Sequence, residues 1–325
     1  MYADQINRTT PYLHVWTLNI QQPLARDLLL ELHYGGSEGH FLQRLNNINQ
    51  PVLRTSLNDA RTLAQRQPWP AYGRFNYLDG MVNSNYNALS AKVTRRMSHG
   101  LNLLAAFTWS HSLDDGSGPR TAYSQLPKNT YDVHDQNYAV SNFDQQRRFV
   151  ASAVYQLPVG KGQKLLNHGG VVDAALGGWQ LGSIVTLMDG FPVTQAGSGD
   201  SDSLNQNANS CNATGISPFL PHPTPQRFWD IAAFNCADPA LYYSVGNVGM
   251  NTLRSPGTRQ WDFSAAKTFK ITERHNVQFR FESFNMSNHP NWNTPSSSTF
   301  TPQTYGVITS AKTMRQLQFA LKYSF

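Results

Sequence analysis

Two carboxylates separated by one residue, Asp200 and Asp202, begin the spacing of a calcium-binding loop. Such a loop needs another oxygen ligand at its fifth position, a glycine at the sixth and a bidentate glutamate at the twelfth. Leu204, Asn205 and Cys211 occupy those positions here. The spacing therefore argues against calcium binding.

A second group with metal-binding side chains combines His111 with Asp114 and Asp115. It follows an apolar segment directly, and polar residues are common where a strand passes into a surface loop. We therefore favour an ordinary loop end over a metal or substrate site.

The segment PVGKGQK at 158–164 lacks the spacing and the Ser or Thr of a phosphate-binding loop. It is interpreted as a basic turn.

No combination of nucleophile, base and acid stands out as catalytic. Ser, His and Asp are plentiful, but nothing resembles the G-x-S-x-G turn of a hydrolase, and no helix is predicted to support one. We expect no enzymatic activity, cofactor or metal.

Cys211 and Cys236 lie in a segment rich in Pro, Asn and Ser, without zinc-ligand spacing. A loop disulfide, which needs an oxidising compartment, is favoured over two unpaired thiols.

The composition is that of a polar chain with few charges. Of 325 residues, 14% are charged, 12% are aromatic, and the formal net charge is +6. A typical soluble domain carries about 25% charged residues. No run of Lys and Arg marks a nucleic-acid partner, and no apolar stretch approaches the roughly 18 residues of a membrane helix. The first residues lack the pattern of a secretory signal, so the chain is either cytosolic or the tail of a longer protein.

Apolar and polar residues alternate in nine segments, the pattern of a β-strand with one apolar face. The clearest is the C-terminal QLQFALKYSF at 316–325. The segments lie near 16–21, 28–34, 89–94, 101–110, 148–157, 179–187, 260–271, 277–282 and 316–325. A tilted strand crosses a bilayer with roughly nine to eleven residues, and we expect these strands to be long enough to do so.

The connections between these segments alternate in length. Short links are expected at 22–26, 98–100 and 272–275, and a moderate one at 158–176; long links are expected at 36–83, 113–145, 190–257 and 288–313. Outer-membrane barrels place short turns on the periplasmic side and long loops outside. A soluble sandwich gives no reason for this asymmetry, so the alternation favours a barrel.

The two faces of the predicted strands suit lipid and water. Aromatic residues fall at both strand ends, as in the girdles at a membrane interface: Trp109 and Trp261 at one end, and Tyr155, Trp179, Phe269, Tyr323 and Phe325 at the other. The opposite face carries charges that suit a water-filled lumen: Arg148, Asp262, Arg280, Glu282 and Lys322. These charges would either contact a solute or a plug domain, or brace the inner wall. The alternative is that the aromatics form the core of a soluble β protein.

Several stretches resemble the C-terminal barrel of TonB-dependent outer-membrane transporters, specifically the Oar-like group common in acidobacteria. They are SNYNALSAKVTRRMSHGLNLLAAFTWSHSLDD at 84–115, DQQRRFVASAVYQLPVGKG at 144–162, GGWQLGSIVTLMDGFPVT at 177–194 and most of 255–288. The resemblance covers nearly all of 12–325 and departs from the family at Gln146 and Arg147, where a His is expected before the Arg and Phe. It implies a barrel of about 22 strands, a plug domain and a TonB box, and it likens Phe325 to the signal read by the barrel-assembly machinery.

We therefore expect an all-β fold, an antiparallel up-and-down transmembrane barrel that is partial, with about nine strands and long extracellular loops. Residues 1–325 would be the C-terminal segment of an outer-membrane barrel, with plug domain, TonB box and signal peptide absent. The resemblance implies energised uptake through the bacterial outer membrane, with lipid, TonB and the assembly machinery as partners. A passive porin or adhesin barrel, and a soluble carbohydrate-binding β-sandwich, are the alternatives. The substrate stays open between a small molecule such as a siderophore, a peptide and a glycan.

Overall fold

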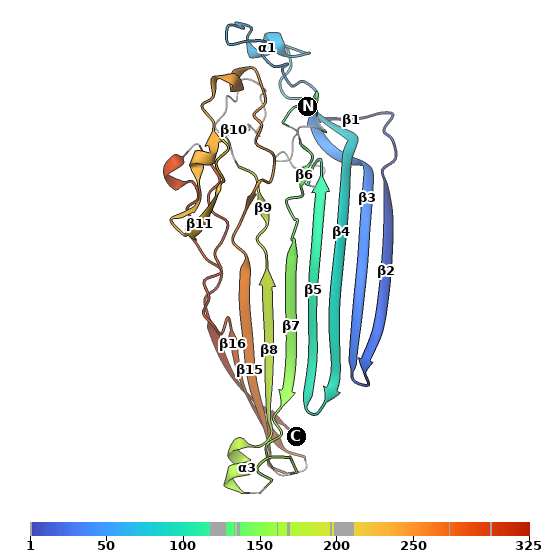
Figure 1. Ribbon diagram of the computed structural model, residues 1–325, viewed down its shortest axis with the longest axis vertical. Coiled ribbons are helices and arrows are strands. Elements are labelled where there is room, and N and C mark those ends of the chain that lie inside the picture. The colour runs from blue at the N-terminus through green and yellow to red at the C-terminus, as the bar shows by residue number, and fades with distance from the viewer. Residues whose placement is uncertain are drawn as a thin grey trace.

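Nine long strands lie side by side in one sheet (Figure 1). The computed structural model describes all residues except 1, 118–127, 133, 135–136, 161, 168–169, 196, 198–210, 273 and 300. In chain order the long strands are β2 (Tyr12–Ala25), β3 (Leu28–Asn47), β4 (Asn76–Ser98), β5 (Leu101–Asp114), β7 (Arg147–Gln156), β8 (Trp179–Met188), β15 (Thr258–Lys270), β16 (Asn276–Phe284) and β17 (Gln316–Ser324). Each contains one of the nine predicted segments, so the all-β prediction is confirmed.

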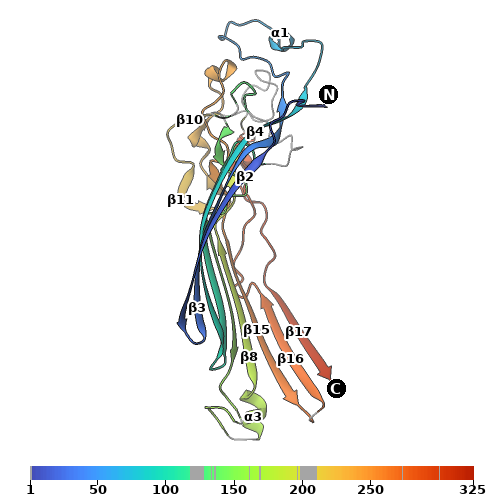
Figure 2. The same cartoon turned by 90° about the vertical axis from the view of Figure 1, so that its right-hand side faces the viewer.

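Each long strand pairs antiparallel with the next long strand along the chain. This order confirms the predicted up-and-down topology. The first and last strands, β2 and β17, are the edges of the sheet and do not pair with each other. Figure 2 shows the sheet twisted and open. The structure therefore agrees with a partial barrel.

Connections of alternating length join the strands. Short turns at 26–27, 99–100 and 271–275 and a moderate link at 157–178 lie at one end, called here the short-turn end. Long connections at 48–75, 115–146, 189–257 and 285–315 lie at the other, the long-loop end (Figure 1). Because neighbouring strands run in opposite directions, every second connection returns to the same end. The predicted alternation of short and long links is therefore present.

The smaller elements belong mainly to these connections. They are β1 (Tyr2–Asp4), which pairs parallel with β4, β6 (Ala139–Val140), β9 (Pro192–Val193), β10 (Asn212–Ala213), β11 (Phe219–Thr224), β12 (Arg227–Trp229), β13 (Phe234–Asn235) and β14 (Leu253–Arg254). Single 3₁₀ turns occupy Ile231–Ala233, Pro239–Tyr242 and Pro302–Thr304. Two short helices, α1 (Leu63–Arg66) and α3 (Val171–Leu176), were not predicted. Helix α1 is stabilised by a capping box in which Thr62 and Gln65 bond each other's backbone.

Strands β3 and β4 continue well beyond the residues where apolar and polar side chains alternate. They contain 20 and 23 residues, and their pairing extends to Asn47 opposite Asn76. Near that end Asn46 and Asn47 are buried. The expected long link at 36–83 is therefore wrong in its bounds, because strand pairing depends on backbone groups and continues where neighbouring loops satisfy the polar side chains.

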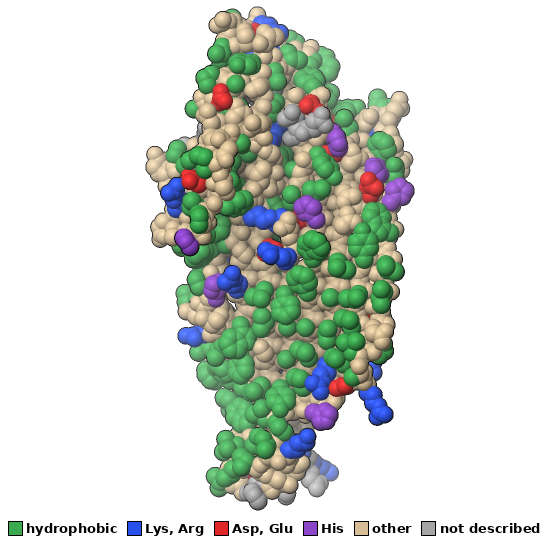
Figure 3. Space-filling view, in the orientation of Figure 1, with side chains coloured by type: hydrophobic (Ala, Val, Ile, Leu, Met, Phe, Trp, Pro, Cys, Tyr) green, Lys and Arg blue, Asp and Glu red, His purple; other side chains and the backbone are tan. Residues whose placement is uncertain are grey.

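The two sides of the sheet differ in chemistry. Residues opposite one another on neighbouring strands share a side, and one such row contains Ile20, Leu32, Ala91, Phe107, Phe149 and Leu187. We call this side the apolar face; Figure 3 shows it as a broad band of hydrophobic side chains. The next row contains Gln21, Glu31, Lys92, Ala106, Val150, Thr186 and Gln260, and its side is called the polar face.

Large apolar side chains of interior strands remain exposed on the apolar face. Trp109 is 61% exposed and Leu187 is 43% exposed. The buried cluster of Trp229, Leu253 and Tyr305 lies instead within the long connections. Within the described residues, no second sheet covers the apolar face, so the alternative of a soluble β-sandwich does not agree with the structure. No described helix is long and apolar enough to cross a membrane.

Candidate functional site

The register of the sheet places the five predicted lumen charges on the polar face. Glu282 and Arg280 of β16 lie opposite Ser264 and Ala266 of β15, and Lys322 of β17 lies opposite Gln278. Asp262 stands two residues before Ser264 on the same side of β15. Four of the five charges therefore share three adjacent strands, because successive odd or even residues of a strand project to one side.

Contacts between these charges are few and local. The Arg280 Nη1 atom lies 3.6 Å from the Glu282 Oε1 atom, and Arg280 Nη2 donates to Gln278 Oε1 at 3.1 Å. Asp262 Oδ1 accepts hydrogen bonds from the Asn285 backbone N–H at 2.8 Å and from Gln260 Nε2 at 3.0 Å. Asp262 thus fixes the start of the connection after β16, whereas Arg280 and Glu282 form a partly exposed polar pair.

Arg148 stands apart from the other four charges. It lies near the long-loop end of β7, opposite Thr108 of β5 and Met188 of β8. Strand β8 separates β7 from β15, so Arg148 is two strand spacings, about 10 Å, from the row of Thr258 on β15. The five charges thus line one wall at separate positions and do not converge on a common centre.

A second polar cluster occupies the same face on strands β2 to β4. Lys92 Nζ lies 2.7 Å from Glu31 Oε2, and Gln21 Nε2 donates to Glu31 Oε1 at 3.2 Å. One row away, His33 Nδ1 lies 2.5 Å from Asn19 Oδ1. All five side chains occupy the polar positions of alternating segments, so the sequence pattern predicts their face but not their mutual contacts. Amides and paired charges of this kind suit water and polar solutes.

The candidate loop group of His111, Asp114 and Asp115 does not converge. Asp115 Oδ1 lies 3.0 Å from His134 Nδ1, and its Oδ2 accepts from a backbone N–H. Asp114 accepts from the Ser117 hydroxyl at 2.8 Å, while His111 faces a different carboxylate. Among the described residues, no three His, Cys, Asp or Glu side chains gather in a way that could hold a metal ion. Asp200 and Asp202 lie outside the described residues.

Cross-connections hold the long loops together at the long-loop end. Cys211 and Cys236 are joined by a disulfide, their Cα atoms 4.3 Å apart, next to the pairing of β10 with β13. Lys128 is buried, and its Nζ donates to the Val248 carbonyl oxygen. Burial lowers the pKa of Lys128 to about 8, because a charged ammonium loses its hydration there. The connections 115–146 and 189–257 are thereby linked.

A model of an outer-membrane β-barrel domain matches residues 1–318. The chain belongs to the outer-membrane β-barrel family. The protein is therefore located in the bacterial outer membrane. Among curated protein sequences, none matches this chain. Family membership confirms the predicted barrel and location, while the Oar-like assignment stays a prediction.

Among solved structures, an outer-membrane transporter shares the fold of this barrel segment. The outer-membrane transporter YddB from Escherichia coli superposes with a TM-score of 0.51 at 8% identity, over 98% of this chain and 33% of that chain. The ferripyoverdine receptor of Pseudomonas aeruginosa superposes with a TM-score of 0.43 at 11% identity, over 97% of this chain and 27% of the receptor. This chain thus spans about a third or less of the length of these proteins.

Proposed function

We propose that the chain forms part of the wall of an outer-membrane transporter, with its apolar face against lipid and its polar face lining a water-filled interior. The register of the sheet supports this: residues such as Phe107 and Leu187 share one side, and charges such as Glu31 and Arg280 share the other. An outward apolar band and a polar interior are the two faces of a barrel that encloses water.

The long-loop end is proposed to face the cell exterior. In outer-membrane barrels the short turns lie in the periplasm and the longer loops outside. Four long connections would then meet an approaching substrate, held in place by the disulfide and by the link from Lys128 to Val248. Binding by the loops, rather than catalysis, is the role that these residues support.

The open edges support a proposal that further strands complete the wall. Backbone groups of β2 and β17 that face away from the sheet have no strand partner within the described residues. Unpaired backbone groups cost several kcal/mol each in hydrocarbon, so spanning sheets close on themselves. We therefore propose a larger barrel, in which a plug domain outside this chain transmits force from TonB and the assembly machinery reads Phe325.

Energised uptake and passive diffusion differ in whether the barrel is plugged. Purified full-length protein should show no steady conductance in a planar lipid bilayer if a plug fills the lumen, whereas a passive porin should conduct continuously. The substrate class stays open between siderophore, peptide and glycan, because the polar face offers hydrogen bonds and charges of both signs.

Sidedness can be tested with a protease site inserted at either end. Gly215, in a long connection, and Gly162, in the link at the short-turn end, both have open space around the Cα atom. Proteinase added to intact cells should cut the insertion after Gly215 and leave the one after Gly162 uncut until the outer membrane is permeabilised. The reverse result would contradict the proposed orientation.

A further inference from the structure

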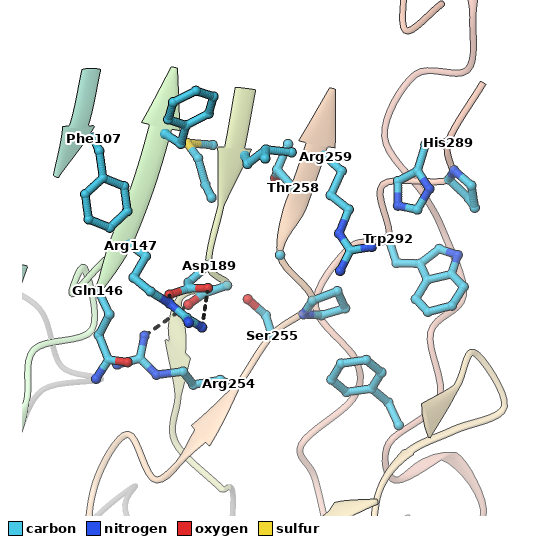
Figure 4. Close-up of a pocket in the computed structure, with 18 residues that line it drawn as sticks. Phe107, Gln146, Arg147, Asp189, Arg254, Ser255, Thr258, Arg259, His289 and Trp292 are labelled. Atoms are coloured by element: carbon cyan, nitrogen blue, oxygen red, sulfur yellow. Dashed lines mark hydrogen bonds and ion pairs between the residues drawn. The ribbon is translucent and has the colours of Figure 1, made fainter. Parts of the chain in front are cut away.

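A cavity of about 960 Å³ lies on the apolar face, where the strands meet the long connections (Figure 4). Its strand side is lined by Phe107 of β5, Phe149 of β7 and Leu187 of β8. These three residues belong to the apolar row described above. The cavity is therefore on the opposite side of the sheet from the proposed lumen, and a solute passing through the barrel would not reach it.

The walls of this cavity do not depend on the open edges of the sheet. Strands β5, β7, β8 and β15 each have a paired strand on both sides. The remaining wall comes mainly from two connections: the one between β8 and β15 contributes residues such as Phe228 and Arg254, and the one that follows β16 contributes His289 and Trp292. Additional strands beyond β2 or β17 would leave this part of the wall as it is.

Basic side chains lie on the side of the cavity nearer the long connections. Arg147 Nε and Nη2 bind the Asp189 carboxylate at 2.8 and 3.1 Å, so this arginine is neutralised. Arg254 is likewise paired with Asp144, which is almost fully buried. Arg259 lines the same cavity, is exposed and has no carboxylate within ion-pair distance among the described residues.

The charges around the cavity leave a net positive charge. Lys312 does not line the cavity: its Nζ donates at 2.8 Å to the hydroxyl of Thr258, which stands two residues before Gln260 and so projects to the polar face. Arg147, Arg254 and Arg259 supply three positive charges against the two carboxylates of Asp144 and Asp189, a local excess of +1 that belongs to Arg259. Figure 3 shows blue and purple side chains at the upper margin of the hydrophobic band.

Cations on the lipid-facing side of a barrel require an anionic partner or water. The cost of Arg or Lys is about 2–4 kcal/mol at the bilayer midplane and falls to about 0–1 kcal/mol near the interfaces. Trp292 at the cavity agrees with an interfacial level, where tryptophan is enriched. Basic pockets of other membrane proteins bind anionic lipid headgroups, and guanidinium groups bind phosphate through paired hydrogen bonds.

We propose that this cavity binds the phosphate headgroup of an anionic lipid, with Arg259 contacting the phosphate and the Phe107, Phe149 and Leu187 side chains contacting the first carbons of an acyl chain. The proposal rests on the proposed orientation of the apolar face toward lipid. It assigns a second ligand to the barrel, separate from any transported solute. Gln146 and Arg147, the two residues that depart from the family pattern, both line this cavity.

The test uses the full-length protein in detergent and native mass spectrometry with added phosphatidylglycerol or phosphatidylcholine. We expect preferential retention of phosphatidylglycerol and about tenfold weaker binding in Arg259→Gln, equivalent to about 1.4 kcal/mol. Arg96→Gln, the same substitution at the short-turn end of β4, is the matched control and should bind as the unmodified protein does. Circular dichroism should show the same β content in both variants.

Three results would overturn the lipid proposal. Equal retention of the two lipids would show that charge is not recognised, and unchanged binding in Arg259→Gln would place the lipid elsewhere. Displacement of phosphatidylglycerol by millimolar inorganic phosphate, with equally tight binding of phosphate alone, would identify a free-phosphate site. Failure of the proposed transport function would appear separately, as a steady conductance in the planar bilayer.

Discussion

Asp144 and Arg254 form an ion pair that links two long connections to each other and to strand β5. Asp144 has a side-chain exposure of 1%, and its carboxylate accepts from the Ser112 backbone N–H at 2.8 Å besides pairing with Arg254. Arg254 also donates to the Gly190 carbonyl at 3.1 Å. One arginine therefore connects three segments that are far apart in the chain.

Arg254→Met should lower the free energy of unfolding by about 3 kcal/mol, because it leaves a buried carboxylate without its cation. Urea unfolding in detergent, followed by tryptophan fluorescence, measures this change. Arg227→Met is the matched control, since Arg227 pairs with Asp230 at 2.9 Å but is 62% exposed. Exposed pairs contribute about 0–1 kcal/mol. Equal effects of the two substitutions would show that burial of Asp144 is not decisive.

Lys128 predicts a pH dependence of stability. Its pKa in the folded protein is lowered to about 8 from 10.5, so the folded state releases this proton at a lower pH than the unfolded state does. The free energy of unfolding should therefore rise between about pH 8 and pH 10.5 and gain nothing from this group below pH 8. In Lys128→Met this rise should be missing from urea unfolding curves; an identical rise in the variant would assign it to other groups.

At the residue scale, the sequence predicted the face of the sheet that a residue occupies better than it predicted the residues that it contacts. The polar positions of Asp262 and Arg280 follow from alternation alone, and the structure places both on the polar face. The pairing of Arg254 with Asp144 joins residues separated by 110 positions and depends on how two loops pack. The cavity beside Arg259 combines residues from 107 to 292, so only the folded sheet brings them together.

Strands in which apolar and polar residues alternate strongly were predictable from the sequence, whereas the residues at which strands end were not. Strands β5, β15 and β17 have one apolar side over most of their length, which the period of two reveals. The outer halves of β3 and β4 contain Gly35, Gly36 and several Asn residues, so the pattern fades although the backbone pairing continues. The small strand pairs in the loops, such as β10 with β13, are two residues long and carry no such pattern.

Adjacent leucines on β5 provide a test of the two faces. Leu103 pairs with Ala153 on the apolar face, and Leu104 pairs with Ser152 on the polar face. Leu103→Arg should lower the free energy of unfolding in lipid vesicles by about 1–2 kcal/mol, because the cost of a lipid-facing arginine lies between about 0–1 kcal/mol at the interface and about 2–4 kcal/mol at mid-bilayer, and Leu103 is near the short-turn end of β5. Leu104→Arg should cost much less, because its guanidinium stays in water. Similar losses for both substitutions would contradict the assignment of faces.

On the scale of the whole molecule, the sheet has the two surfaces of a barrel wall without closing into a barrel. Its apolar face is exposed on interior strands, its polar face carries charges of both signs, and its edges β2 and β17 are open. The all-β topology followed from the sequence because each strand pairs with the next one along the chain. The curvature and the packing of the loops depend on distant contacts and were not predictable from local patterns.

The surroundings of the two faces are measured most directly with spin labels at neighbouring positions of β15. Single cysteines replace Ser264, on the polar face, and Ala265, on the apolar face, in full-length protein reconstituted in lipid vesicles. The label at 265 should collide mainly with molecular oxygen, which concentrates in hydrocarbon, and the label at 264 mainly with a water-soluble nickel chelate. Equal access of the nickel chelate to both labels, or a label at 265 shielded from both reagents, would contradict the barrel-wall account.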